Sequence, residues 1–283
     1  CNVVKAGVAD GGEGTVEAIV KAVGGDMYAA SVTDPLGRPV KAAYGIVRSG
    51  GVKTAVMEMS AASGLPLLLP DELNPWITST YGTGEMISDA LNRGCRKFLV
   101  GIGGSATNDA GTGMLSALGV RFLDSRGQRL KGCGRDLESI ARIDMSSLMP
   151  AARESEFIVA CDVNTPFCGP DGAARVFAPQ KGADPQTAEA LDRGMRSFAR
   201  VIAEQFQTDI VPLSGAGAAG GLGGAFKAFL NARLTAGIEM VLDAIAFDSL
   251  LEGADLVITG EGRIDAQTAA GKTAAGVLRH AAR

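Results

Sequence analysis

Carboxylate and amide side chains follow predicted strands in three separate parts of the chain. They are Asp10 and Glu13, then Asp162 and Asn164, then Glu261 and Asp265. The carboxyl end of a strand is where α/β sheets usually place ligands. A carboxylate there could take a proton from a substrate hydroxyl, and Glu261 and Asp265 could bind Mg²⁺. A strand-end aspartate such as Asp162 is equally well explained as a helix or turn cap.

A loop rich in glycine and hydroxyl side chains follows the apolar run at residues 96–102 and precedes a helical pattern at residues 114–119. Glycine permits positive φ angles and close backbone approach, so several N–H groups can point at one anion. The helix N-terminus adds a partial positive charge. We therefore predict a phosphate-binding loop made of Gly103, Gly104, Ser105, Ala106, Thr107 and Asn108. The alternative is a tight turn with Asn108 or Asp109 as a helix cap, which leaves Ser105 and Thr107 unexplained.

The spacing of this loop matches neither of the common nucleotide-binding motifs. No lysine closes it as in the phosphate loop, and no acidic residue ends a second strand at the distance a dinucleotide fold requires. Basic side chains are found instead at Arg263 and Lys272, where they could neutralise phosphoryl or carboxylate oxygens. The alternative for that segment is a surface loop of solvated ion pairs.

Strands that alternate with helices must position these groups. Apolar runs predict strands at residues 96–102, 156–160 and 254–259, and helical spacing predicts helices at residues 186–205, 225–232 and 274–282. Antiparallel strands with tight turns are predicted at residues 29–32, 40–43, 45–48 and 54–59. The glycine tract at residues 214–224 predicts either close backbone approach or a flexible hinge. The predicted fold class is α/β, with a mainly parallel sheet and glycine-rich loops at the strand ends.

The composition excludes several classes of protein. The chain has 283 residues, of which 46% are hydrophobic and 20% charged, which is typical of folded domains and not of disordered chains. A net charge of −4 without a basic run disfavours a nucleic-acid partner, and the apolar runs fall far short of the roughly 18 residues of a membrane span. The five cysteines lack a metal or disulfide spacing, which predicts free thiols in a reducing cytoplasm. The single histidine, His280, cannot build a histidine triad or a zinc site.

Six short motifs run from one end of the chain to the other. They are ADGGEG at residues 9–14, GIGGSATND at 101–109, ACDV at 160–163, FAPQKG at 177–182, GAGAAGG at 215–221 and VITGEGRIDAQT at 257–268. Together they resemble the bacterial type I glycerate kinase family. The resemblance implies transfer of the ATP γ-phosphoryl group to a hydroxyl of D-glycerate, most commonly giving 2-phosphoglycerate. It also implies two α/β domains: an incomplete outer, Rossmann or flavodoxin-like domain at residues 1–25 and 254–283, and an inserted domain at residues 26–253.

The resemblance, combined with the chemistry of phosphoryl transfer, suggests a role for each candidate residue. The loop at residues 103–108 would bind the ATP phosphates, and Glu261 or Asp265 would bind Mg²⁺. Asp162, with Asp265 as the alternative, would orient the glycerate hydroxyl and accept its proton, and Lys272 would hold transition-state oxygens. The expected substrate-binding residues are Asp10, Glu13, Asn164 and Arg263.

Family members usually open with a strand and an Asp-Ser-Phe-Lys motif, and they continue well past the last helix predicted here. The chain is therefore expected to be part of a longer protein, whose other segments would supply a lysine and a serine near the substrate. A homodimer is one candidate assembly. Two other classes stay open. A nicotinamide-dependent oxidoreductase needs a ribose-binding acid that is not visible in the sequence, and a non-catalytic module would bind nucleotide without transferring phosphate.

Overall fold

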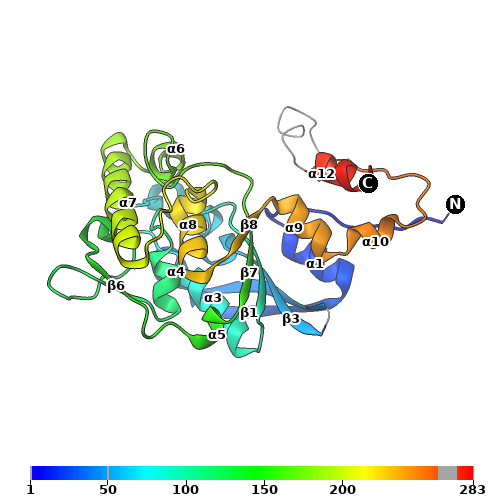
Figure 1. The fold of residues 1–283 in the computed structure, drawn as a ribbon, viewed down its shortest axis with the longest axis horizontal. Helices are drawn as coiled ribbons and strands as arrows, with labels where there is room; N and C mark the ends of the chain where they lie inside the picture. The colour runs from blue at the N-terminus through cyan, green and yellow to red at the C-terminus, as the bar shows by residue number, and fades with distance from the viewer. Residues whose placement is uncertain (1, 50, 261–272, 283) are drawn as a thin grey trace.

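The computed structural model describes residues 2–49, 51–260 and 273–282. The described residues form one six-stranded sheet and a smaller sheet of two strands (Figure 1). The strands are β1 (Gly25–Thr33), β2 (Pro39–Ser49), β3 (Val52–Glu58), β4 (Lys97–Gly101), β5 (Arg121–Leu123), β6 (Arg142–Asp144), β7 (Glu156–Ala160) and β8 (Arg233–Thr235). The larger sheet has the order β1-β2-β3-β4-β7-β8, and β5 pairs with β6.

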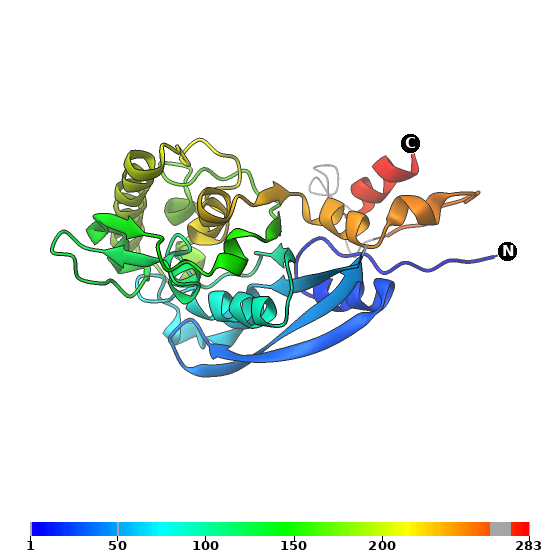
Figure 2. The ribbon, with the colours of Figure 1, turned by 60° about the horizontal axis from the view of Figure 1, so that its bottom comes forward.

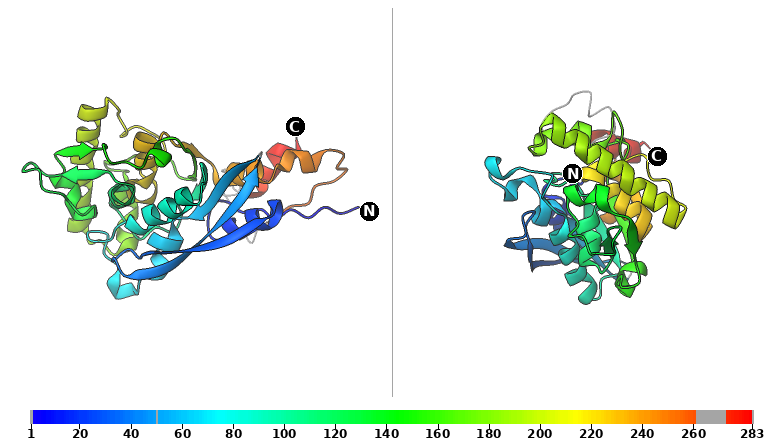
Figure 3. Two further views of the ribbon diagram at one scale, coloured as in Figure 1. Left: turned by 90° about the horizontal axis from the view of Figure 1, so that it is seen from below. Right: turned by 90° about the vertical axis from the view of Figure 1, so that its left-hand side faces the viewer.

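Helices surround the larger sheet. The longer ones are α1 (Thr15–Val23), α3 (Tyr81–Asn92), α4 (Thr112–Ala117), α7 (Pro185–Phe206), α8 (Ala218–Leu230), α9 (Gly237–Ala244) and α12 (Thr273–Ala281). The short ones are α2 (Ser60–Ser63), α5 (Pro150–Arg153), α6 (Ala173–Phe177), α10 (Phe247–Leu251) and the 3₁₀ turns η1 (Leu65–Leu67), η2 (Pro70–Glu72), η3 (Gly134–Ser139) and η4 (Pro179–Lys181). Both ends of the described chain lie beside α9, α10 and α12, whereas α7 lies at the opposite end of the molecule (Figures 1 and 3).

The larger sheet changes from antiparallel to parallel pairing at β3. Strands β1, β2 and β3 pair antiparallel, and β3, β4, β7 and β8 pair parallel, with Val56 beside Leu99 and Leu99 beside Ile158. Figure 2 shows the long antiparallel strands, in blue, along one side of the molecule. The α/β class is confirmed, and the carboxyl ends of β3, β4 and β7 meet at one edge of the sheet.

The strands predicted separately at residues 40–43 and 45–48 are one continuous strand, β2. Gly45 lies inside the strand, where its missing side chain admits helix α1. A Cβ atom at Gly45 would lie 2.3 Å from a methyl carbon of Val20. The turn from β1 to β2 is the predicted one, and Asp34 Oδ1 accepts hydrogen bonds from the backbone N–H groups of Leu36 and Arg38.

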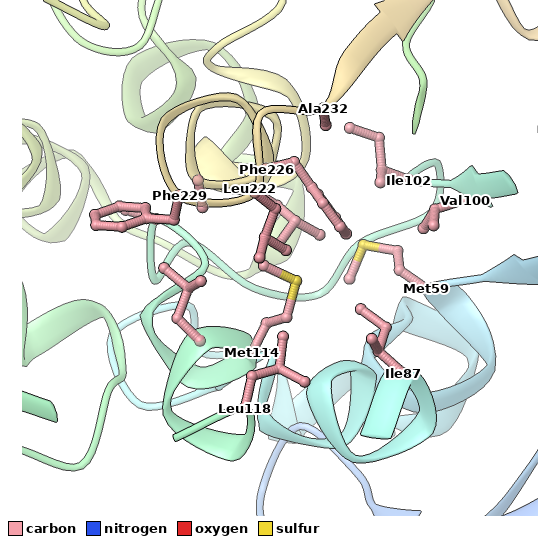
Figure 4. Close-up of a cluster of buried hydrophobic side chains, with 14 of the residues drawn as sticks. Met59, Ile87, Val100, Ile102, Met114, Leu118, Leu222, Phe226, Phe229 and Ala232 are labelled. Atoms are coloured by element: carbon pink, nitrogen blue, oxygen red, sulfur yellow. The ribbon is translucent and has the colours of Figure 1, made fainter. Parts of the chain in front are cut away.

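Successive residues of the parallel strands face opposite sides of the sheet, as the two-residue period of a strand requires. On one side Phe98 and Phe157 stack with 4.7 Å between ring centroids, and Phe226 of α8 packs against Phe157. Figure 4 shows Met114 of α4 and Leu222 of α8 in the same core. This larger core holds α3, α4, α7 and α8 against the sheet.

The other side of the sheet forms a second, smaller core. Leu99 and Ile158 point to this side and pack with Val16 of α1, Val241 of α9 and Val277 of α12. Because both sides of β4 and β7 are buried, these strands are continuous apolar runs, which is why the sequence predicted them correctly. The division into an outer domain at residues 1–25 and 254–283 and an inserted domain at residues 26–253 stays a prediction.

The strand predicted at residues 254–259 does not form, and this prediction is wrong. Residues 254–260 have no regular secondary structure, and Leu256 and Ile258 are 76% and 86% exposed. A strand needs a neighbour that accepts its hydrogen bonds, and no described strand pairs with this segment. The strand end predicted before Asp10 is likewise without regular structure.

The glycine tract at residues 214–224 overlaps the first half of α8 and is closely packed. A Cβ atom at Gly220 would lie 2.2 Å from the Thr107 carbonyl oxygen, and Gly220 O accepts a hydrogen bond from Ala110 N at 2.9 Å. Ala219, Gly220 and Gly221 have positive φ angles, where only glycine is free of strain. The structure therefore supports the close-approach interpretation of this tract over the hinge.

Candidate active site

A cavity of about 280 Å³ lies at the carboxyl ends of β4 and β7. It is lined by Leu65 and by residues of four further segments, which are 10–12, 102–105, 160–163 and 177–181, together with Ala218 and Ala219 at the start of α8. Ligands of parallel α/β sheets bind outside these strand ends, because the loops there are free of the sheet ladder. The cavity thus joins five of the six motifs that the sequence singled out.

The predicted phosphate loop divides into an open part and a buried part. Gly103 and Gly104 are exposed, and they line the cavity together with Ser105. Ala106, Thr107 and Asn108 are fully buried and do not line it. The structure therefore places three of the six predicted phosphate-binding residues at the cavity and the other three beneath it.

Two backbone contacts attach this loop to the segment after β3. Leu65 N donates to Gly104 O at 2.9 Å, and Ala106 N donates to Ser63 O at 3.0 Å. Gly104 has a φ of 70°, a conformation that favours glycine. A Cβ atom added at Gly103 would have no other atom within 4 Å, so there is open space at this position. The loop is rigidly held, with its glycines at the surface of the cavity.

Asp109, which the sequence offered as a helix cap, is fully buried below the loop. Its Oδ2 accepts hydrogen bonds from Thr80 N at 2.7 Å, Thr80 Oγ1 at 2.8 Å and Gly113 N at 3.2 Å, while its Oδ1 accepts from Gly111 N at 3.0 Å. Burial raises the pKa of Asp109, and these hydrogen bonds act against that shift. The carboxylate ties the loop to the starts of α3 and α4.

Asp10 and Asp162 line the same cavity although they are far apart in the sequence. Asp162 Oδ1 accepts a hydrogen bond from Gly237 N, the first residue of α9, at 2.9 Å. A Cβ at Gly237 would lie 1.7 Å from Asp10 O, so the glycine lets the Asp10 turn rest on α9. Asp162 thus accepts a hydrogen bond at a helix start, as the cap interpretation expects, and its catalytic role stays a prediction for a residue that lines the cavity.

The other substrate-binding candidates lie outside the cavity lining. Glu13 is exposed on the turn before α1, and Asn164 is exposed and accepts a hydrogen bond from Ser214 Oγ at 2.8 Å. Four predicted site residues lie outside the described residues, so their roles stay predictions: Glu261, Arg263, Asp265 and Lys272. Across residues 2–49, 51–260 and 273–282, no group of three histidine, cysteine or acidic side chains is arranged to hold a metal.

Lys181 is the cavity residue to which the sequence analysis assigned no role. It is 1% exposed, and its Nζ donates to Ser105 Oγ and to Thr107 O, both at 2.7 Å. Burial lowers the pKa of Lys181 to about 7, and the negative charge of Asp109 partly opposes this. Lys181 belongs to the motif FAPQKG, but nothing in that motif indicates that the lysine is buried.

The whole chain, residues 1–283, matches the Glycerate kinase family. The chain belongs to this family. It is 49% identical over 274 residues to the glycerate kinase of Halalkalibacterium halodurans, covering 97% of this chain and 72% of the relative. It is 47% identical to the glycerate 2-kinase of Escherichia coli, covering 95% of this chain and 70% of that one.

A solved structure supports the same assignment. A crystal structure assigned as glycerate kinase 2 from Salmonella typhimurium LT2 matches with a TM-score of 0.92 and 48% identity, covering 98% of this chain and 73% of that one. The chain is therefore a kinase, a phosphotransferase that uses an alcohol group as acceptor. In the described parts of the chain, no helix is long and apolar enough to cross a bilayer.

Proposed function

We propose that the chain transfers the γ-phosphoryl group of ATP to the 2-hydroxyl of D-glycerate, giving 2-phosphoglycerate, as a type I member of its family. The observation that carries this proposal is the convergence of Asp10, Asp162, Lys181 and the open glycines of the 103–105 segment on one cavity. The glycerate 2-kinase of Escherichia coli, at 47% identity, supports the position of the transferred group.

Asp162 is the residue best placed to act on the substrate hydroxyl. Its Oδ1 is oriented by Gly237 N at 2.9 Å, which holds the carboxylate at the cavity wall. A carboxylate in that position orients the hydroxyl and receives its proton as the bond to phosphorus forms. Asp265 remains the alternative acceptor for that proton, and it lies outside the described residues.

Gly103 and Gly104 are the predicted cradle for the ATP phosphates, because backbone N–H groups without side chains allow an anion to approach closely. Lys272 and Arg263 are the predicted partners of the remaining phosphoryl and carboxylate oxygens. Catalysis in such a site consists mainly of positioning and charge neutralisation, so the rigid attachment of the loop favours this role.

The donor set of the cavity fits Mg²⁺. In phosphoryl-transfer sites Mg²⁺ is usually bound by one or two carboxylates together with substrate phosphates and water. Asp10 supplies a carboxylate at the cavity, and Glu261 and Asp265 remain the predicted ligands outside the described residues. Bound Mg²⁺ would neutralise charge on the phosphate oxygens.

The proposal is tested by phosphorus NMR of the products formed from ATP, Mg²⁺ and D-glycerate. We expect 2-phosphoglycerate, and 3-phosphoglycerate would refute the proposed position of transfer. Asp162→Asn should lower kcat by about 100-fold or more, since general base catalysis contributes roughly 10²–10⁴-fold. Full turnover in that variant would remove the role of Asp162.

A matched pair of glycine variants tests the loop. Gly103→Leu would place a side chain in the open space at the cavity, whereas Gly7→Leu adds the same side chain at an exposed glycine that also has open space and does not line the cavity. We expect Gly103→Leu to raise the KM for ATP at least tenfold and Gly7→Leu to leave it unchanged. Equal KM values in both variants would contradict phosphate binding at this loop.

Three further proposals concern the whole protein. The division into an outer and an inserted domain remains a proposal, and the smaller core packs Val16 and Val277 of the outer segments against Leu99 and Ile158 of the inserted one. A cytoplasmic location is supported by four free cysteines among the described residues, which are Cys95, Cys133, Cys161 and Cys168. A homodimer remains a candidate assembly, and light scattering of the purified chain would test it.

A further inference from the structure

Lys181 is a charged side chain that is buried without a carboxylate partner. Of the three donors of an ammonium group, two are used by Ser105 Oγ and Thr107 O. Among the described residues, no carboxylate forms an ion pair with Lys181. Buried charges in proteins are normally paired, because leaving the solvent is costly for them. Asp109 is the nearby negative charge, but it forms no ion pair with the amine, so the site lacks a directly bound anion.

The position of Lys181 shows where such an anion would enter. Lys181 lines the cavity together with Ser105, Gly104 and Asp162, and its Nζ is hydrogen-bonded to the hydroxyl of Ser105, another lining residue. Ser105 and Thr107 belong to the loop at the end of β4, and Lys181 ends the 3₁₀ turn η4. The two hydrogen bonds join these segments and fix the nitrogen against the loop at residues 105–107.

We propose that Lys181 binds an anionic oxygen of a substrate in this cavity and takes up a proton from solvent as that oxygen binds. The oxygen belongs either to the carboxylate of the hydroxy acid or to a phosphoryl group. This inference rests on the proposed function, and it adds a residue and a proton that the proposed transfer does not require. The step is a proton transfer alone: an N–H bond forms on Lys181 as the buffer acid loses that proton, and no other bond of the lysine changes.

The groups around Lys181 determine its protonation before a ligand arrives. Asp109 below the loop is the negative charge that raises the pKa of Lys181, and burial outweighs it, so the pKa falls to about 7. Asp10 and Asp162 line the same cavity, as does Cys161, whose thiol has a pKa raised by burial and stays neutral. At pH 8 an amine with this pKa is only about one-tenth protonated, and a bound anion restores its charge.

Isothermal titration calorimetry of the full chain tests this inference. Binding of D-glycerate, and separately of an ATP analogue with a non-transferable γ-phosphoryl group, is measured at pH 8 in Tris and in HEPES, and the dependence of enthalpy on buffer gives the number of protons taken up. We expect net proton uptake at pH 8 with the ligand that contacts Lys181, and less uptake at pH 6, where the amine is already mostly protonated. Comparing the proton uptake of the two ligands identifies which of them carries the anionic oxygen.

A lysine pair provides the matched control. Lys181→Met should weaken binding of that one ligand at least tenfold and abolish its proton uptake. Lys227→Met, at an exposed position on α8, should change neither quantity. Circular dichroism verifies that each variant is folded, and if Lys181→Met does not fold, the buffer dependence of the wild type decides alone.

The outcomes separate this inference from the proposed function. A wild-type chain that binds neither ligand refutes the proposed function, together with the inference that rests on it. Binding of both ligands without proton uptake at pH 8, or with the same Kd in Lys181→Met, overturns the role of Lys181 and leaves the proposed function standing.

Discussion

Replacing the buried carboxylate of Asp109 should be among the most damaging single changes at the site. Asp109→Ala leaves three backbone N–H groups, those of Thr80, Gly111 and Gly113, buried without an acceptor. Each unsatisfied group costs about 1–3 kcal/mol, and removal of a buried charge offsets part of the sum. We expect the free energy of unfolding to fall by about 4 kcal/mol. Asp109→Asn should cost only ~1–2 kcal/mol, because its amide oxygen can still accept from Thr80 and Gly113.

Urea denaturation followed by circular dichroism measures these differences, provided that the m-value is unchanged. The control is Asp124→Ala. Asp124 Oδ1 accepts from Arg126 N at 2.9 Å and Gln128 N at 2.8 Å, but in a turn that faces solvent, where water replaces the lost acceptor. The expected cost there is below about 1 kcal/mol. Equal losses in the Asp109→Ala and Asp124→Ala variants would refute the argument that burial sets the magnitude.

Two further predictions concern a histidine and a glycine. Hydrogen bonds to Glu239 and Asp248 raise the pKa of His280, so its stabilisation is complete below about pH 6.5 and is lost as the pH rises through the folded pKa. Urea unfolding at pH 6 and pH 9 should show this loss, and His280→Asn should remove it; an unchanged pH dependence would contradict the assignment. Gly220→Ala should lower the free energy of unfolding by at least ~2 kcal/mol, because its φ is 67° and the space that a Cβ atom would need is filled. Gly37→Ala, with a φ of 87° and open space at that position, should cost only about 1 kcal/mol in the same measurement.

Local patterns in the sequence were sufficient to predict the elements that bury an apolar face or run in the core. The helical spacing at residues 186–205 corresponds to α7, and the apolar runs before Gly101 and Asp162 correspond to β4 and β7. The same kind of run at residues 254–259 formed no strand, because strand formation depends on a partner that the run itself does not contain. The continuity of β2 through residues 40–48 likewise was not evident locally, because the close contact at Gly45 is a property of the packing between α1 and β2.

The sequence by itself determined the fold class, the glycine loop after β4 and the carboxylates that follow the strands, because residue type and order encode turns and strand ends directly. Only the tertiary structure decided which of these residues share a cavity. Asp10 lines the same cavity as Asp162 because Gly11 and Gly237 allow the chain to approach β7 and α9 closely. The burial of Lys181 likewise depends on the segments packed around it, since the environment of a charge is set by residues that are distant in the sequence.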